Sequence, residues 1–395
     1  MASAANRIIV SHVGSLVRPP PLVDFLRKVQ DNQPYDKAGF EACLTQSVID
    51  AVRRQAECGV DIVSDGEYGK SVNWAFYVHR RLTGLERRAL TAEEAKDPLN
   101  VVISGRDREA FPEFYAEYDA RVLANARGVR RPVVTGPLVY TGEAELQHDI
   151  ANLKAGLGEA QGVTGFLPVV APASALPNAK IEHYRDDESF LFALADALRT
   201  EYRAVLDAGL DLQVDDAFLP YMYEKLVPPM TLADYRKWAG LRIAALNHAL
   251  KGLPPERTRY HICWGSWNGP HMFDVPIKDI VDLLLQVEVG ALSFEAANPR
   301  HEHEWQVWKT VKLPPGRVLM PGVVTHSTNI VEHPELVAER LERFAQCVGR
   351  ENVMAGTDCG FSQSPLAGRV HRSIMWAKLK SLAEGAAIAS KRLWS

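Results

Sequence analysis

The feature that most constrains the fold is a repeated alternation of short apolar runs with longer stretches of helical periodicity. The apolar runs predict eight strands, at 8–15, 61–67, 132–136, 210–216, 260–264, 291–296, 318–324 and 352–358. Apolar residues recur at three- and four-residue spacing in the helical stretches 37–58, 188–208, 231–250, 277–289 and 334–348. Strands that alternate with helices are typical of a parallel sheet covered on both faces. Eight such units predict an α/β fold of the (β/α)8 TIM-barrel class.

The chain has 395 residues, a length that barrels of this class occupy as one domain with loop insertions. We therefore expect a single catalytic barrel domain over 1–395. Two segments, at about 80–131 and 143–187, do not follow the alternation of strands and helices. Both are interpreted as insertions in barrel loops.

Charge and cysteine content exclude several classes of protein. The 45 basic and 49 acidic residues are mixed along the chain, with no basic stripe that would bind nucleic acid. No run of about 18 apolar residues and no leader-like N-terminus occur, so we expect a cytoplasmic protein without a membrane span. Five cysteines are too few and too scattered for a secreted disulfide framework. The sequence leaves open whether the chain forms a homo-oligomer.

Polar residues cluster at the end of each predicted strand, and four of them form a candidate metal site. His261 and Cys263 are two residues apart on a strand, so both point to the same side. Glu295 and Cys359 follow two other strands, whose ends meet at the same face of a barrel. One nitrogen, two thiolates and a carboxylate suit Zn²⁺. The alternative is that these are buried core residues, because an H-x-C pair often occurs by chance.

Taken in order, the strand-end motifs resemble the cobalamin-independent methionine synthases, namely their catalytic C-terminal barrel and their short stand-alone relatives. The motifs are HVGS, SDGE, TGP, QVDDA, HIC, FEAANPR, PGVV followed by VEHPE, and TDCGF. The resemblance extends over nearly the whole chain. It implies a 5-methyltetrahydropteroyltriglutamate-homocysteine S-methyltransferase activity, in which a methyltetrahydrofolate-type donor methylates the thiol of homocysteine to give methionine.

The resemblance also assigns residues to roles. It implies that zinc binds to His261, Cys263, Glu295 and Cys359. It further implies that the amino-acid part of homocysteine binds to a second set of strand-end residues, which are Gly14, Ser15, Glu67 and Asp215. Backbone N–H and hydroxyl groups suit a carboxylate, and acids suit an ammonium group. Without the resemblance, the two acids read equally well as caps of the helices that follow them.

One position departs from the pattern of the large synthases. Their acid-catalytic histidine follows the seventh strand, where this chain has Ser327, with His326 one position away. We therefore expect His326 to be the general acid that protonates the leaving nitrogen, with water as the alternative. The N-terminal barrel that helps the large enzymes to hold folate has no counterpart here.

Other residues near the strand ends have two interpretations. Four aromatic residues could stack on a ring-bearing donor or act as packing or lid residues, namely Trp74, Tyr140, Trp264 and Trp267. The run from His301 to Glu304 has the composition of a metal cluster but is expected to start a solvated helix. Arg18 and Arg300 could bind a substrate anion or form ordinary ion pairs.

Three other functions stay open. The first is alkylation of another thiol, as in the epoxyalkane:coenzyme M transferases, which resemble this family. The second is a metal-free lyase similar to the uroporphyrinogen decarboxylases, which the two predicted thiolate ligands disfavour. The third is zinc storage without catalysis. The presence of predicted substrate-binding residues beside the metal site disfavours it.

Overall fold

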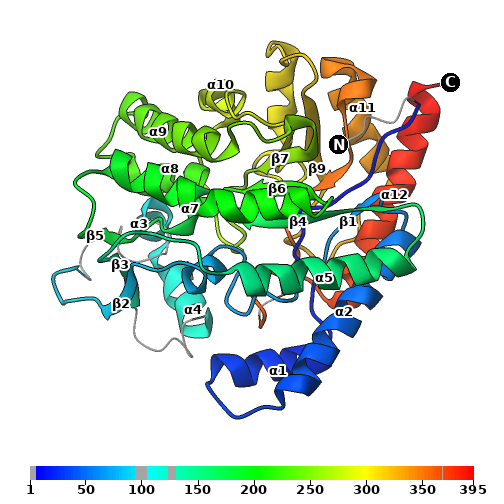
Figure 1. The fold of residues 1–395 in the computed structure, drawn as a ribbon. Helices are drawn as coiled ribbons and strands as arrows, with labels where there is room; N and C mark the ends of the chain where they lie inside the picture. Colours follow the sequence, from blue (N-terminus) through cyan, green and yellow to red (C-terminus); the bar gives the residue numbers. More distant parts are fainter. Residues whose placement is uncertain (1–5, 95–104, 123–129, 367) are drawn as a thin grey trace.

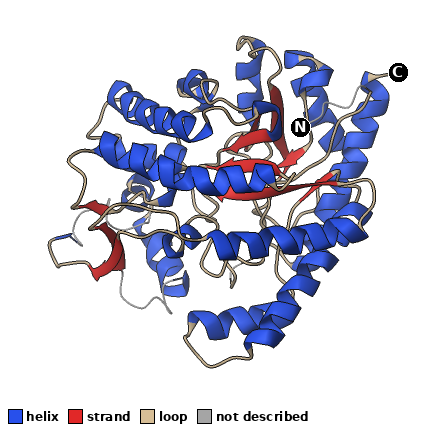
Figure 2. Cartoon of the chain, viewed as in Figure 1, coloured by secondary structure: helices blue, strands red, loops and turns tan. Residues whose placement is uncertain are grey.

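Parallel strands in one curved sheet form the centre of the molecule (Figures 1 and 2). The computed structural model describes residues 6–94, 105–122, 130–366 and 368–395. Within these ranges seven strands pair in chain order: β1 (Ile62–Val63), β4 (Thr164–Val170), β6 (Asp211–Asp215), β7 (Thr258–His261), β8 (Ala291–Phe294), β9 (Val318–Val324) and β10 (Gly356–Thr357). Every neighbouring pair is parallel.

The N-terminal segment closes this sheet into a barrel. Val10 forms a parallel bridge to Ala355, just before β10, and Ser11 forms a parallel bridge to Ile62 in β1. The segment around Val10 and Ser11 therefore occupies the place of the first barrel strand, between the two edges of the sheet. The predicted (β/α)8 barrel is confirmed.

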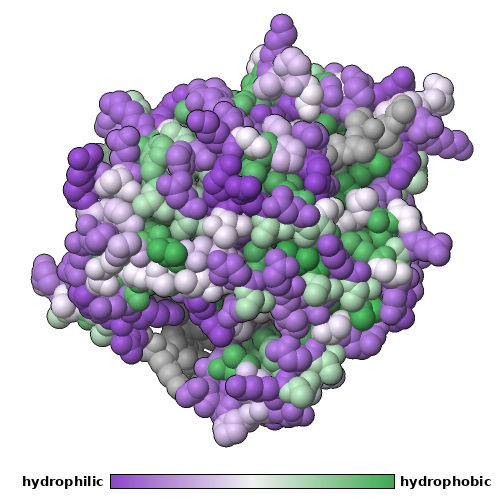
Figure 3. Space-filling model, in the orientation of Figure 1, coloured by the Kyte–Doolittle hydropathy of each residue, from purple (hydrophilic) through white to green (hydrophobic). Residues whose placement is uncertain are grey.

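Helices cover the outside of the barrel (Figure 2). The longest are α2 (Lys37–Glu57), α5 (Glu143–Glu159), α7 (Asp187–Asp207), α9 (Leu232–Leu250), α11 (Pro334–Val348) and α12 (Arg372–Leu393). Shorter helices are α1 (Pro20–Gln30), α3 (Arg106–Ala110), α4 (Pro112–Val122), α6 (Pro172–Ala175), α8 (Phe218–Leu226) and α10 (Val281–Leu284). None of these helices is both long and apolar enough to cross a membrane. The face shown in Figure 3 is mostly hydrophilic, with scattered apolar patches.

The prediction of the third barrel strand was wrong. Residues 132–136 overlap β3 (Arg130–Val134), which belongs to a separate small sheet with β2 (Leu85–Ala89) and β5 (Lys180–Ile181). The barrel strand at this place is β4, so the segment 143–187 is no loop insertion but contains α5 and β4. Pro168 within β4 made the segment read as a loop, because proline cannot donate a ladder hydrogen bond. The segment 80–131 contributes β2, α3 and α4, which lie beside the barrel (Figure 1).

A buried arginine ties the first strand segment to the opposite part of the barrel. Arg259 of β7 is fully buried and lies over the ring of Phe166, 3.7 Å from its centroid. Its guanidinium donates to Gln213 Oε1 at 2.6 Å, to Ser11 Oγ at 2.7 Å and to the carbonyl of His12 at 2.7 Å. Burial lowers the pKa of Arg259 to about 9. Polar groups inside the barrel are thus satisfied by one another, as a buried polar network requires.

Arg259→Met tests this role in stability. The substitution leaves three buried acceptors without their donor, so we expect the free energy of unfolding to fall by about 3 kcal/mol. Urea unfolding followed by circular dichroism measures it. The control is Arg53→Met on α2, an exposed arginine whose loss should change stability by no more than about 0.5 kcal/mol. Equal effects of the two substitutions would contradict the role given to Arg259.

Candidate metal centre and substrate cavity

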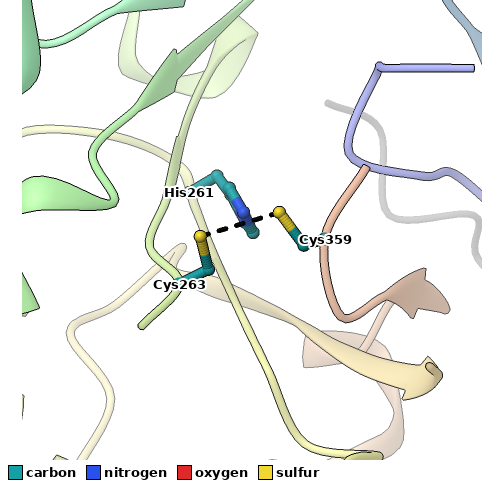
Figure 4. Close-up of side chains that lie close together, drawn as sticks. All are labelled: His261, Cys263 and Cys359. Atoms are coloured by element: carbon teal, nitrogen blue, oxygen red, sulfur yellow. Dashed lines mark hydrogen bonds between the residues drawn. The ribbon is translucent and has the colours of Figure 1, made fainter. Parts of the chain in front are cut away.

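Three of the four predicted metal ligands meet at the C-terminal face of the barrel. His261 ends β7, Cys263 lies two residues further on, and Cys359 lies two residues beyond the end of β10. All three are buried, and their donor atoms lie within 4.8 Å of one another. Figure 4 shows Cys359 facing the other two from a different segment of the chain. The two sulfur atoms are 3.6 Å apart.

The imidazole of His261 is oriented by its second nitrogen. Nδ1 lies 3.0 Å from Ser293 Oγ on β8, whereas Nε2 is buried without a hydrogen-bond partner among the described residues. A buried nitrogen without a partner costs free energy unless a ligand satisfies it. Histidine ligands of metals are commonly held in this way through the other ring nitrogen. The residues present therefore fit a metal ion.

The two thiols differ in acidity. A hydrogen bond between the sulfur atoms raises the pKa of Cys263 and lowers the pKa of Cys359, and burial raises the pKa of Cys263 further. Cys359 is therefore the more easily ionised of the pair. A thiolate is the form in which cysteine binds a metal.

Glu295 lies next to this cluster but outside the group of three. It follows β8 and is buried, and its Oε1 accepts a hydrogen bond from the backbone N–H of Trp264 at 3.1 Å. Its Oε2 accepts one from the side chain of Asn298. Burial and Asp358 raise the pKa of Glu295 well above its usual value. Its role as the fourth ligand stays a prediction.

Of the four residues predicted to bind the amino-acid part of homocysteine, two line the cavity and two are buried outside its wall. Ser15 and Asp215 line the same cavity as the three metal-ligand candidates. Glu67 is buried and accepts hydrogen bonds from Ser15 Oγ and, at 2.7 Å, from Lys70 Nζ. Gly14 has a φ of +124°, and a Cβ there would approach Pro168 to 2.6 Å, so this position requires glycine. Sequence reasoning missed Lys70, three residues after Glu67 in the same turn.

The cavity has a volume of about 280 Å³, and six aromatic side chains contribute to its walls. Phe218 stacks between Trp74 and Phe76, with centroid distances of 6.2 and 6.1 Å. Tyr118 of α4 also lines it, so the segment 80–131 contributes to the wall. Of the aromatic residues considered from the sequence, Trp74 and Trp267 line the cavity. The other two, Trp264 and Tyr140, are buried and do not line it.

His326 lies just after β9 and outside the cavity wall. It is buried, and neither ring nitrogen has a hydrogen-bond partner among the described residues. Burial lowers the pKa of His326 to about 4, so the imidazole is neutral near pH 7. Its role as general acid stays a prediction.

A helix does begin at this run, as the 3-10 helix η6 (Glu302–Lys309), but the expectation that its start is solvated was wrong for His301. The side chain is buried and stacks on Trp264, with ring centroids 3.9 Å apart. Nε2 lies 3.0 Å from Asp274 and Nδ1 lies 2.8 Å from Glu304. Burial alone would lower the pKa of His301, but the two carboxylates raise it to about 10. His301 is therefore an imidazolium that pairs with two buried acids beneath the loop of Trp264, and Asp274 also pairs with His271 at 3.1 Å.

The two arginines considered from the sequence do not line the cavity. Arg18 is buried and donates to the backbone carbonyls of Glu67 and Lys70, at 2.5 and 3.2 Å. Arg300 donates to the carbonyl of Met272 at 2.5 Å. A third arginine, Arg369, lines the cavity instead.

Comparisons with known proteins confirm the resemblance to methionine synthases. The fold is similar to that of a B12-independent methionine synthase from Shewanella sp. W3-18-1 in complex with selenomethionine. The TM-score is 0.70 at 19% identity, over 98% of this chain and 99% of that one. A methionine synthase of Sulfolobus acidocaldarius is 21% identical over 384 residues, which are 96% of this chain and 92% of that protein.

A further relative has a different name. The 2-hydroxypropyl-CoM lyase of Xanthobacter autotrophicus is 25% identical over 237 residues, which cover 53% of this chain and 57% of that protein. No family model matches the sequence. At these identities the structural comparison establishes a shared fold.

The buried imidazolium of His301 predicts a pH-dependent stability. A histidine in the unfolded chain has a pKa of about 6.5, whereas that of folded His301 is about 10. The folded state therefore holds an extra proton between these values, so the contribution is complete below pH 6.5 and is lost as the pH rises toward 10.

His301→Gln should lower the free energy of unfolding by about 3 kcal/mol near pH 6.5, since it removes the charged partner of the buried Glu304 and leaves Asp274 paired with His271 alone among the described histidines. The difference from the wild type should shrink steadily up to pH 9.5 in urea unfolding. The control is His248→Gln, which removes a half-exposed histidine paired with Asp196 at 2.6 Å and should change little at any pH. A difference that does not vary with pH would contradict the assignment.

Proposed function

We propose that this chain is a zinc-dependent methyltransferase that moves a methyl group from a methyltetrahydrofolate-type donor to the thiol of homocysteine, giving methionine. The observation that carries the proposal is the buried cluster of His261, Cys263 and Cys359 in the wall of an aromatic cavity. The donor set of one nitrogen and two sulfurs favours zinc among the common metals. Glu295 is proposed as the fourth ligand, at a position that a substrate sulfur could take.

Zinc at this site would lower the pKa of a coordinated thiol, so that the acceptor is a thiolate near neutral pH. The protein's own side chains would then position the reactants. Ser15, held by Glu67, offers a hydroxyl in the cavity wall, and Asp215 offers a carboxyl group to an ammonium group. The aromatic walls exclude water and offer faces on which a ring-bearing donor could stack. His326 is proposed as the source of the proton for the leaving group, which requires bound substrate to raise the pKa of this neutral imidazole, and water is the alternative.

Alkylation of a different thiol is the second candidate. Lys70 already pairs with Glu67 at 2.7 Å, which weakens the attraction of this carboxylate for a substrate ammonium group. A thiol without an ammonium group would not need it. The partial similarity to a 2-hydroxypropyl-CoM lyase supports the same alternative.

Cys359→Ser tests the metal centre. We expect about one zinc per wild-type chain by elemental analysis, and proton release when homocysteine is added, because the thiol binds as a thiolate. The variant should lose most of the metal and the proton release. Cys347→Ser on α11 is the control, because Cys347 lies outside the cluster. A wild-type protein without zinc, or zinc that does not depend on Cys359, would refute the proposal.

Ser293→Ala tests the orientation of His261. The hydroxyl of Ser293 is the partner of Nδ1, so its removal should weaken zinc binding roughly 10- to 100-fold without removing a ligand. Competition with a chromophoric chelator measures the affinity. Ser47→Ala on α2 is the matched control, and zinc affinity in Ser293→Ala equal to that control would show that the contact does not orient the ligand.

A further inference from the structure

Arg369 is a cationic residue in the wall of the cavity, and no carboxylate partners it within the described parts of the chain. It lies after β10, on the segment that follows Cys359, and it is half-buried. Asp215 lies in the same wall, but no ion pair joins the two residues. Several of the other lining residues are aromatic or apolar, and a charge beside apolar surface is screened less than one in bulk water.

The chain holds Arg369 in a defined position. Its backbone N–H donates to the carbonyl of Phe361 at 3.0 Å, which closes the segment into a loop. Its Nε donates to Gln363 Oε1 at 3.3 Å. Gln363 in turn donates to the carbonyl of Gly360, next to Cys359. Neither Nη atom has a hydrogen-bond partner among the residues that the structure describes, so both can bind a ligand.

The charge of Arg369 favours an anionic group at its part of the wall, while Asp215 stays the proposed partner of an ammonium group. Glu67, the acid behind Ser15, is neutralised by Lys70, and both of its oxygens accept hydrogen bonds from the protein. Arg369 has no comparable neutralising partner. A guanidinium with two free Nη groups matches the planar pair of oxygens of a carboxylate and also binds a sulfonate.

We propose that Arg369 binds the carboxylate or sulfonate of the small molecule that occupies this cavity and thereby selects anionic substrates. The proposal rests on the proposed function in that the same cavity receives the thiol and the group donor. The anionic group belongs either to the acceptor thiol or to the donor. Arg369 is therefore proposed as a specificity-determining residue, separate from the metal ligands.

The first experiment needs neither metal nor turnover. Binding of benzoate, benzenesulfonate and neutral benzamide to the metal-free protein is measured by tryptophan fluorescence, because Trp74 and Trp267 line the cavity. We expect both anions to bind the wild type at least about tenfold more tightly than benzamide, and Arg369→Gln to remove this preference. Arg369→Lys should retain part of this preference, because lysine keeps the positive charge but lacks the planar set of N–H donors of the guanidinium. Arg300→Gln is the control, with unchanged binding. Equal affinities of anions and benzamide in the wild type, or anion binding unchanged in Arg369→Gln, would overturn the proposal.

The second experiment identifies the source of the anion in zinc-loaded protein. Proton release is titrated with 3-mercaptopropionate, 2-mercaptoethanesulfonate and neutral 2-mercaptoethanol. If the anion belongs to the thiol, Arg369→Gln weakens binding of the two anionic thiols only. If it belongs to the donor, thiol binding is unchanged and KM for methyltetrahydrofolate rises. No effect on either overturns the proposal. If the wild type binds no thiol, the methyltransferase proposal fails, and the binding experiment with benzoate still decides the role of Arg369.

Discussion

The closure of the barrel at Val10 and Ser11 is the constraint on which the site depends. This segment lies between β1 and β10, so the loops that follow the first and last barrel strands leave the sheet side by side. The backbone N–H of Phe361 donates to the carbonyl of Ser15 at 2.9 Å, and a Cβ at Gly360 would approach Ser15 Cβ to 2.6 Å. This close approach places a substrate-binding candidate beside Cys359. Parallel register then brings His261 and Cys263 to the same cavity from β7.

Buried charged residues around the site are paired with hydrogen-bond donors or with groups of opposite charge. Asp358 accepts hydrogen bonds from the backbone N–H groups of Ala296 and Ala297, both at 2.8 Å, so it ties the loop after Glu295 to the segment of Cys359. His301 pairs with Asp274 and Glu304 below Trp264, whose backbone N–H donates to Glu295. These contacts position the candidate ligands through their backbones. The strand-end motifs therefore include residues that support the site as well as residues that line it.

The sequence predicts which residues at the strand ends lie together, because an extended strand has a period of two and parallel strands end at one face. That reasoning predicted the grouping of His261, Cys263 and Cys359. The prediction failed at β4, because Pro168 made this barrel strand look like a loop. Residues 132–136 have the pattern of a barrel strand but overlap β3 of the small sheet. Sequence reasoning also missed Lys70 and Arg259 and expected His301 to be solvated, because charged side chains are usually exposed and only a three-dimensional partner reveals why one is buried. Arg369 belongs to the same group, since its position in the cavity wall depends on the closure of its loop.

The proposed function depends on His261, Cys263 and Cys359 forming a zinc site that binds a substrate thiol. X-ray absorption at the zinc edge of the purified protein, with and without homocysteine, tests this claim most directly. Such a site should show two sulfur neighbours and two nitrogen or oxygen neighbours, and homocysteine should replace one of the latter with a third sulfur. A shell of only oxygen and nitrogen, or one that is identical with and without the thiol, would contradict it.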